Sequence, residues 1–124
     1  MSSVTLEKFI PPVFVSKGWG WESWIVNNDQ YCGKVLFFKK GKRCSWHKHL
    51  VKSETFFLNT GKLLLTYGWE DDISLANHVE LNPGECFEIP VGLRHQMYGL
   101  EDSHLIEFST THSDEDSIRI TKGD

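Results

Sequence analysis

Two histidines and a glutamate lie close together in segment 41–61, which begins and ends with glycine. His47 and His49 are two positions apart, so on a β-strand both side chains project from the same face, because strand side chains alternate with a period of two. The two imidazoles can therefore share one metal ion. Glu54 follows five positions after His49, so on an uninterrupted strand it would point the other way. The segment thus predicts a strand, a turn through residues 50–53 and a second strand that brings Glu54 back to the histidines.

A second pattern with a histidine follows downstream, and the two patterns together resemble a known family. The first runs Gly41, five residues, His47-Lys48-His49, four residues, Glu54, six residues, Gly61; the second runs Gly84, five residues, Pro90-Val91-Gly92, two residues, His95. They resemble the two cupin motifs, except that Gly99 stands where asparagine is usual. The resemblance implies an all-β cupin fold, a double-stranded β-helix of the jelly-roll class. It also implies that one divalent metal ion is held by His47, His49, Glu54 and His95. Imidazole and carboxylate together suit Zn, Mn, Fe, Ni or Co.

The hydrophobic pattern is also that of an all-β protein, because period-two runs recur between turn residues and no long apolar stripe has the helical period. Residues 59–61, Asn-Thr-Gly, predict a hairpin turn between two of these runs. We expect strands at residues 13–15, 22–26, 33–39, around 47–49, 54–58, 62–69, 73–81, 86–89, 95–98 and 104–109.

Composition indicates one ordinary domain over residues 1–124, since the chain is 40% hydrophobic and has enough apolar material for a core. We expect residues 1–16 to form an N-terminal arm and residues 110–124 a C-terminal tail. The three cysteines form no CxxC pair, which argues against a disulfide framework or a thiolate zinc site.

The expected partners and location follow from charge and from the first residues. A net charge of −4 with scattered lysines gives no basic stripe for nucleic acid, and nothing points to a membrane. The N-terminus lacks the apolar run of a signal peptide, so the expected location is the cytoplasm. Single small cupins commonly pair, and the aromatic segment 19–24 could pack across a two-fold axis, so we expect a homodimer.

Three further stretches resemble the C-terminal cupin of type II mannose-6-phosphate isomerases. They are Trp19-Gly20, Lys52-Ser53-Glu54-Thr55-Phe56 and Asp114-Glu115-Asp116-Ser117-Ile118-Arg119. The resemblance implies a metal-dependent sugar-phosphate isomerase that interconverts mannose 6-phosphate and fructose 6-phosphate. The first ligand position, usually glutamine in that family, is His47 here.

Aldose–ketose isomerisation needs a Lewis acid at the sugar oxygens and a base near the carbon that loses its proton. The catalytic candidates are Glu54, Lys52 and Arg119, of which the last two are carried by the resemblance. Glu54 is compromised as a base if it binds metal, so Glu88 and Glu107 are the spare candidates. The candidates for substrate binding are the cations Arg94 and Lys34 and the aromatic residues Trp46 and Tyr98.

Two other functions are compatible with the same residues. Histidines and a carboxylate also suit an Fe(II) dioxygenase. The small size also fits a non-catalytic carbohydrate-binding cupin. In each sugar-related reading the partner is a small sugar or sugar phosphate.

Overall fold

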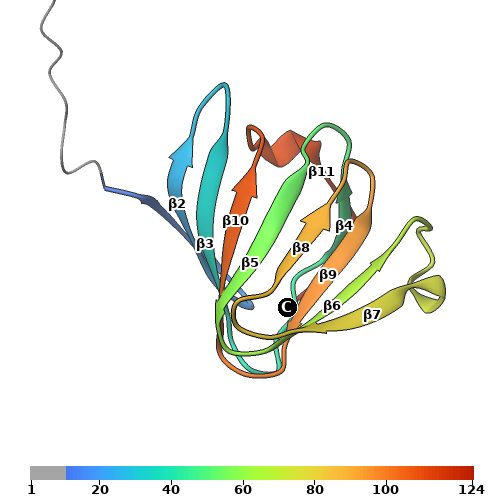
Figure 1. Cartoon of the computed structure of the whole chain (residues 1–124). Helices are drawn as coiled ribbons and strands as arrows, with labels where there is room; N and C mark the ends of the chain where they lie inside the picture. Colours follow the sequence, from blue (N-terminus) through green and yellow to red (C-terminus); the bar gives the residue numbers. More distant parts are fainter. Residues whose placement is uncertain (1–10) are drawn as a thin grey trace, which may run out of the picture.

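Two antiparallel β-sheets face each other in the computed structural model, which describes residues 11–124 (Figure 1). Sheet A consists, in spatial order, of β1 (Val13–Lys17), β2 (Gly20–Asn27), β3 (Cys32–Phe38), β10 (Ser103–Ser109), β5 (Glu54–Thr60) and β8 (Cys86–Ile89). Sheet B consists of β11 (Ser117–Thr121), β4 (Trp46–His49), β9 (Arg94–Gly99), β6 (Leu63–Gly68) and β7 (Asn77–Leu81).

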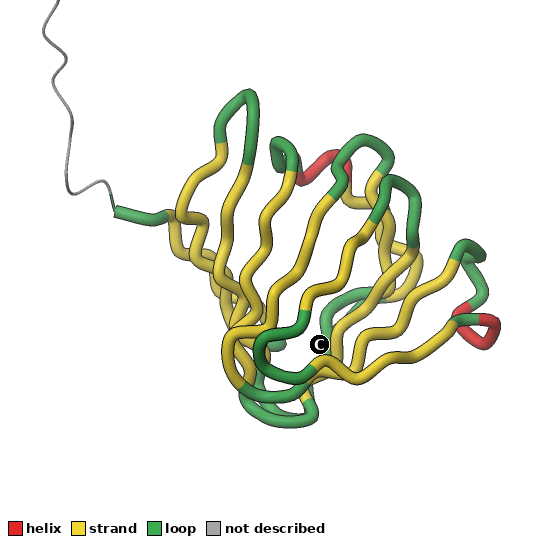
Figure 2. Tube along the Cα trace, in the orientation of Figure 1, coloured by secondary structure: helices red, strands yellow, loops and turns green. Residues whose placement is uncertain are grey.

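Strands and loops make up almost all of the described chain (Figure 2). Its helical segments are two single 3-10 turns, η1 (Ile73–Leu75) and η2 (Asp114–Asp116). Within residues 11–124, no helix has the length and apolar character needed to cross a membrane. The all-β prediction is therefore confirmed.

Polar and apolar residues separate along the inner face of sheet A. Alternate residues of β3 and β10 point inward, and the register pairs Leu36 with Leu105 at one end and Lys34 with Glu107 further along. The inner faces of both sheets contribute apolar side chains to one hydrophobic core. This core contains Phe38, Phe56, Leu58, Leu63, Leu65, Met97 and Leu105. The inner face thus changes from a hydrophobic core to a polar wall along the strands.

Two of the sequence predictions about local structure are wrong. The run 73–81 is not one strand, because Ile73–Leu75 forms η1, where the Asp72 carboxylate accepts a hydrogen bond from the Ser74 N–H at 3.0 Å. Residues 59–61 do not close a hairpin, because β5 belongs to sheet A and β6 to sheet B. The chain crosses from one sheet to the other there. A turn signal identifies a change of direction but not the partner of the next strand.

A close backbone contact explains why glycine, and not the usual asparagine, stands at position 99. A Cβ atom at this position would lie 2.5 Å from the carbonyl oxygen of Lys39, so no side chain fits. The Gly99 N–H donates to the Lys42 carbonyl at 2.9 Å, and the Gly41 N–H donates to the Gly99 carbonyl at 2.8 Å. Glycine at position 99 therefore lets the end of β9 pack directly on the turn before β4.

The N-terminal and C-terminal segments add edge strands to the sheets. Of the expected arm 1–16, residues 1–10 lie outside the described residues, and the rest runs into β1, which pairs with β2 at the edge of sheet A. The tail 110–124 contains η2 and β11, and β11 pairs with β4 at the edge of sheet B. The tail consequently lies beside the strand that carries His47 and His49.

Candidate metal centre and its cavity

Three histidines from neighbouring strands form a group that can hold a metal ion. His47 and His49 project from the inner face of β4, and β9 places His95 directly opposite His47 in the register. One nitrogen of each ring lies within 4.8 Å of the others. The ring centroids of His47 and His95 are 4.3 Å apart, and those of His49 and His95 are 5.5 Å apart. The period-two argument for the first two histidines holds, and strand pairing brings in the third.

Backbone carbonyls orient two of the rings. The Nδ1 atom of His47 lies 2.9 Å from the carbonyl of Ser45, and that of His95 lies 2.9 Å from the carbonyl of Leu93. An imidazole that donates its Nδ1 proton keeps the lone pair on Nε2, which is the arrangement that metal-binding histidines use. Burial, and then the neighbouring histidines, hold the pKa of His47 well below its usual value, so this ring stays neutral and able to bind a metal.

Glu54 reaches the histidines from the opposite sheet. It is the first residue of β5 in sheet A, and the turn through residues 50–53 carries the chain across from β4 in sheet B. Its Oε2 atom lies 3.0 Å from Nε2 of His95 and 3.4 Å from Nε2 of His49. The predicted return of Glu54 toward the histidines is therefore present, and it is achieved by a change of sheet.

The donor atoms at this centre fit a bound cation. Oε2 of Glu54 and Nε2 of His95 are buried, and neither has a hydrogen bond of good geometry in the described structure. Buried polar atoms in proteins nearly always have a partner, so unpaired polar atoms that converge on one point fit a cation bound between them. Burial works to raise the pKa of Glu54, but the contacts with His49 and His95 and the Lys52 charge outweigh it and hold this pKa well below the usual value. The carboxylate is thus ionised, as a metal ligand must be.

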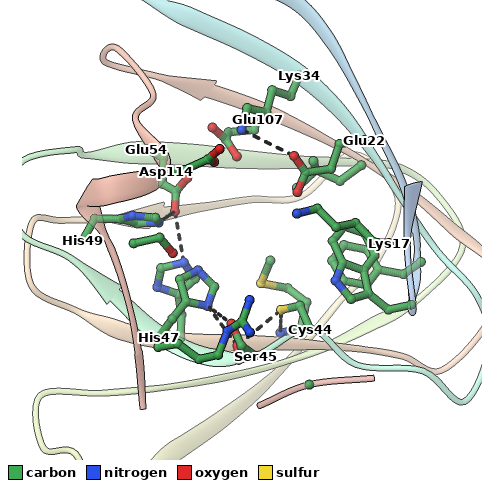
Figure 3. Close-up of a pocket in the computed structure, with 18 of the residues that line it drawn as sticks. Lys17, Glu22, Lys34, Cys44, Ser45, His47, His49, Glu54, Glu107 and Asp114 are labelled. Atoms are coloured by element: carbon green, nitrogen blue, oxygen red, sulfur yellow. Dashed lines mark hydrogen bonds and ion pairs between the residues drawn. The ribbon is translucent and has the colours of Figure 1, made fainter. Parts of the chain in front are cut away.

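The histidines open onto a cavity of about 610 Å³ between the two sheets. His47, His49 and Glu54 lie on one side of it, and Lys17, Glu22 and Lys34 lie on the other (Figure 3).

A buried lysine links Glu54 to a second carboxylate in this cavity. The Lys52 ammonium lies 3.4 Å from Oε1 of Glu54 and 3.2 Å from Oε2 of Glu107, and it also lies 3.0 Å from Nδ1 of His112. Burial alone would lower the pKa of Lys52, but the charges of Glu107 and Glu54 raise it instead, so the lysine is charged.

Glu107 has the opposite shift from that of Glu54. Burial and the charge of Glu54 raise the pKa of Glu107 above its usual value, and the cations Lys52 and Lys34 only partly offset them. Ser109 also donates a hydrogen bond to its Oε2 at 2.9 Å. Two carboxylates in one cavity with pKa values pushed apart are a common arrangement for groups with different chemical roles.

Of the remaining predicted residues, only some line the cavity. Lys34 lines the cavity, and its ammonium lies 3.5 Å from Glu22 and 4.4 Å from the centre of the Trp24 ring. Arg119 of β11 lies at the exposed side of the cavity. Glu88 is exposed on the outer side of β8.

Arg94, Trp46 and Tyr98 lie outside the cavity, contrary to the expectation for substrate-binding residues. Each occupies a strand position that alternates with an inward-pointing neighbour, so its side chain leaves the opposite face. Arg94 pairs with Asp71 at 2.8 Å, and the Trp46 indole donates to the carbonyl of the same residue at 2.8 Å. Tyr98 packs against the Arg43 guanidinium.

Sequence reasoning did not single out Glu22 or His112. Both line the cavity, and His112 lies in the segment after β10 that carried no strand or motif signal. Only the tertiary structure brings both residues into the cavity onto which the histidines open.

The two facing antiparallel sheets have the cupin fold, and solved structures share this fold. A variant of oxalate decarboxylase from Bacillus subtilis superposes with a TM-score of 0.79 at 15% identity, covering 96% of this chain and 33% of that one. The capsular polysaccharide assembling protein CapF from Staphylococcus aureus gives 0.75 at 21% identity, covering 88% and 34%. KdgF from Halomonas sp. gives 0.65 at 19% identity, covering 77% and 82%.

Two curated proteins are similar in sequence, and both are named as sugar isomerases. The D-lyxose/D-mannose isomerase of Thermosediminibacter oceani is 30% identical over 112 residues, covering 74% of this chain and 62% of that protein. The D-lyxose ketol-isomerase of Cohnella laeviribosi is 30% identical over 114 residues, covering 75% and 63%. This chain therefore spans less than two thirds of either relative. No family model matches the chain.

Proposed function

We propose that this cupin is a metal-dependent aldose–ketose isomerase that acts on a free sugar of the mannose or lyxose type. The observation that carries the proposal is the placement of Glu107 and Lys52 beside a three-histidine group and Glu54 in one cavity. Similarity to two sugar isomerases supports the reaction class.

Four side chains are assigned to the metal in this proposal: His47, His49, Glu54 and His95. A divalent ion bound there would act as a Lewis acid on the sugar oxygens. The three neutral imidazoles and one carboxylate leave a net positive charge at the centre, which favours an electron-rich ligand such as adjacent sugar oxygens. The metal is one of Zn, Mn, Fe, Ni or Co.

Glu107 is the proposed base. Isomerisation takes the proton from C2 of the aldose and returns it to C1, while the hydroxyl proton on O2 moves to O1. A carboxylate that is not a metal ligand and whose pKa is raised suits such a two-way transfer, because it binds the proton firmly enough to hold it and gives it back. Lys52 holds Glu107 in place, and the positive charge of Lys52 stabilises the negative charge that develops on the substrate.

The cavity lining carries as many acidic as basic residues, which suits a neutral sugar. The lining includes five lysine or arginine residues and five aspartate or glutamate residues. Lys34 and Lys52 face carboxylates, and Arg94 is turned away. A phosphate dianion requires uncompensated donors, and the cations at the exposed side of the cavity, among them Arg119, are the candidates for that role.

The test is isomerisation by the chain loaded with each of the five metals. D-mannose, D-lyxose and mannose 6-phosphate are incubated separately in deuterated water, and ketose formation and deuterium uptake at carbon are followed by NMR. We expect conversion of a free sugar with at least one metal. Faster conversion of mannose 6-phosphate would transfer the proposal to the phosphosugar.

No conversion and no deuterium uptake with any metal would overturn the proposal. Sugar-induced thermal stabilisation that survives chelation would then favour a carbohydrate-binding cupin. Oxygen consumption by the iron-loaded chain would instead favour a dioxygenase.

We also propose that the chain forms a homodimer through the outer face of sheet A. Trp21 stacks on Phe37 there and also contacts the tilted ring of Phe14, which is 64% exposed. Trp19 takes no part, since it is buried against Phe38 in the core. Light scattering should give twice the chain mass, and Phe14→Ser should lower it; a monomer would contradict this proposal.

A further inference from the structure

A single carboxylate accepts most of the N–H hydrogen bonds of the turn between the second and third proposed metal ligands. This turn, residues 50–53, joins His49 at the end of β4 to Glu54 at the start of β5. Asp116 accepts hydrogen bonds from three of its successive backbone N–H groups, those of Leu50 at 2.9 Å, Val51 at 2.8 Å and Lys52 at 2.9 Å.

The fourth N–H group of the turn is also satisfied by the segment after β10. Ser53 donates to the Thr110 hydroxyl at 3.3 Å, and the Thr110 N–H donates back to the Ser53 carbonyl at 3.1 Å. The turn therefore makes no hydrogen bond through its N–H groups to its own sheets. Its position depends on residues that are about 60 positions away in sequence.

Asp116 is close to a ligand as well as to the turn. Its Oδ2 atom lies 3.9 Å from Nδ1 of His49, a buried nitrogen that has no hydrogen-bond partner in the described structure. The side chain of Asp116 is only 10% exposed, so its hydrogen bonds to the turn are shielded from water. On the other side, the His49 carbonyl accepts a hydrogen bond from the Gly92 N–H at 2.9 Å.

We propose that Asp116 is a positioning residue that sets metal affinity by fixing the turn between His49 and Glu54. Two ligands on opposite sheets can converge only if the turn that joins them has one conformation, and the carboxylate of Asp116 provides that constraint. This inference rests on the metal centre of the proposed function. In this proposal the C-terminal tail, through Asp116 of η2, determines how well the proposed ligands are preorganised for the metal.

The test measures binding of Co²⁺ to the purified chain, by competition with a chelating dye and by its visible absorption bands. Asp116→Ala removes all three acceptor bonds. Asp116→Asn keeps one accepting oxygen but turns an amide N–H toward the backbone N–H of Lys52. The control is Glu115→Gln, which changes the charge of the exposed neighbour in η2. Melting temperatures of all variants are measured in chelator.

We expect Asp116→Asn to weaken Co²⁺ binding by about 10- to 100-fold, the usual effect of losing a residue that orients a metal ligand, and Asp116→Ala by at least as much. Glu115→Gln should bind within about twofold of the unmutated chain, since it orients no ligand. The Co²⁺ bands of Asp116→Asn should also change, because the ligand geometry is altered.

Unchanged Co²⁺ affinity in Asp116→Asn, together with a lower melting temperature in chelator, would overturn the inference and leave Asp116 a merely structural residue. An equal loss in Glu115→Gln would overturn it too, because charge alone would then explain the effect. A chain that binds Co²⁺ with this pattern but isomerises no sugar would overturn only the proposed function. A chain that binds no divalent ion would overturn both.

Discussion

Two glutamates of sheet A differ mainly in which face of the sheet they occupy. Glu107 on β10 points into the cavity and is buried, whereas Glu88 on β8 is exposed on the outer side. Only β5 separates the two strands. Because side chains alternate along a strand, a shift of one residue in register would exchange such roles. The chemistry of the site therefore depends on register at the level of single residues.

Glu107→Gln should lower the turnover number by about 10²- to 10⁴-fold, because glutamine has the same shape but cannot accept a proton. Metal affinity should change little, since Glu107 contacts Lys52 and Ser109 and none of the histidines. Steady-state kinetics and a metal titration check both expectations. Glu88→Gln is the matched control and should be fully active. Equal losses in the two variants would contradict the assignment of Glu107.

Activity should fall on the acidic side as Glu107 becomes protonated, and at a higher pH than for an ordinary glutamate, because burial raises its pKa. Lys34 is one of the cations that oppose this shift. Lys34→Met removes the charge of Lys34 and its ion pair with Glu22. The pKa of Glu107 should therefore rise further, and the acidic limb of kcat/KM should move to higher pH.

The pH profile of kcat/KM is measured at saturating metal, so that protonation of the proposed metal ligands does not contribute to its acidic limb. Lys62→Met is the control, because Lys62 pairs with Glu80 on the surface and should leave the limb in place. A limb that moves to lower pH in Lys34→Met would show that Glu107 is not the titrating base.

At the scale of elements, the connection between β5 and β6 shows what a turn signal does and does not specify. Gly61 has a positive φ of 95°, as the glycine of a turn should. Yet the turn passes from sheet A to sheet B, and its backbone lies against Asp102 and Ser103. The glycine is required both for its backbone conformation and for this close approach.

Gly61→Ala should therefore lower the free energy of unfolding by about 2 kcal/mol or more, which combines the strain of a positive φ with the clash of the new methyl group. That Cβ would lie 2.3 Å from the carbonyl oxygen of Asp102. Gly84→Ala is the control: its φ of 89° is similar, but nothing lies within 4 Å of the added atom. Gly84→Ala should cost only about 1 kcal/mol. Urea denaturation of the two variants measures the difference, and equal losses would contradict the packing argument.

For the whole molecule, a metal ion at the proposed centre would couple sheet A to sheet B. The three histidines come from β4 and β9 of sheet B, and Glu54 comes from β5 of sheet A. An ion bound to all four would connect the two walls of the cavity. It would therefore stabilise the folded chain, because the separated ligands of the unfolded chain bind the ion poorly.

Chelation should lower the melting temperature. At a free metal concentration about 100 times the dissociation constant, bound metal contributes about 2.7 kcal/mol to stability. Scanning calorimetry with metal and with chelator measures the change. His47→Ala should remove most of the metal-dependent difference. His78→Ala should keep it, because His78 lies at the Thr66 hydroxyl, outside the three-histidine group. A melting temperature of the unmutated chain that is unaffected by metal would contradict this coupling.

The fold class and the histidines of the proposed centre can be predicted from the sequence alone. Turn glycines and period-two runs are local signals, and the i, i+2 spacing of His47 and His49 fixes one strand face without knowledge of the rest. The same rule places Trp46 on the face opposite the histidines, and Arg94 and Tyr98 likewise alternate with inward-pointing neighbours. All three therefore lie outside the cavity, contrary to the expectation that they bind substrate.

The surroundings of the histidines, in contrast, depend on the tertiary structure. Strand order brings Glu107 beside Lys52, and the pairing of β11 with β4 brings Asp116 to a turn from which it is distant in sequence. These contacts join residues more than 50 positions apart, and they depend on how the sheets pair and face each other. A local pattern carries no information on that pairing. The residues that can bind a metal are therefore visible in the sequence, whereas the contacts that Asp116 and Glu107 make around them depend on how the two sheets close around the cavity.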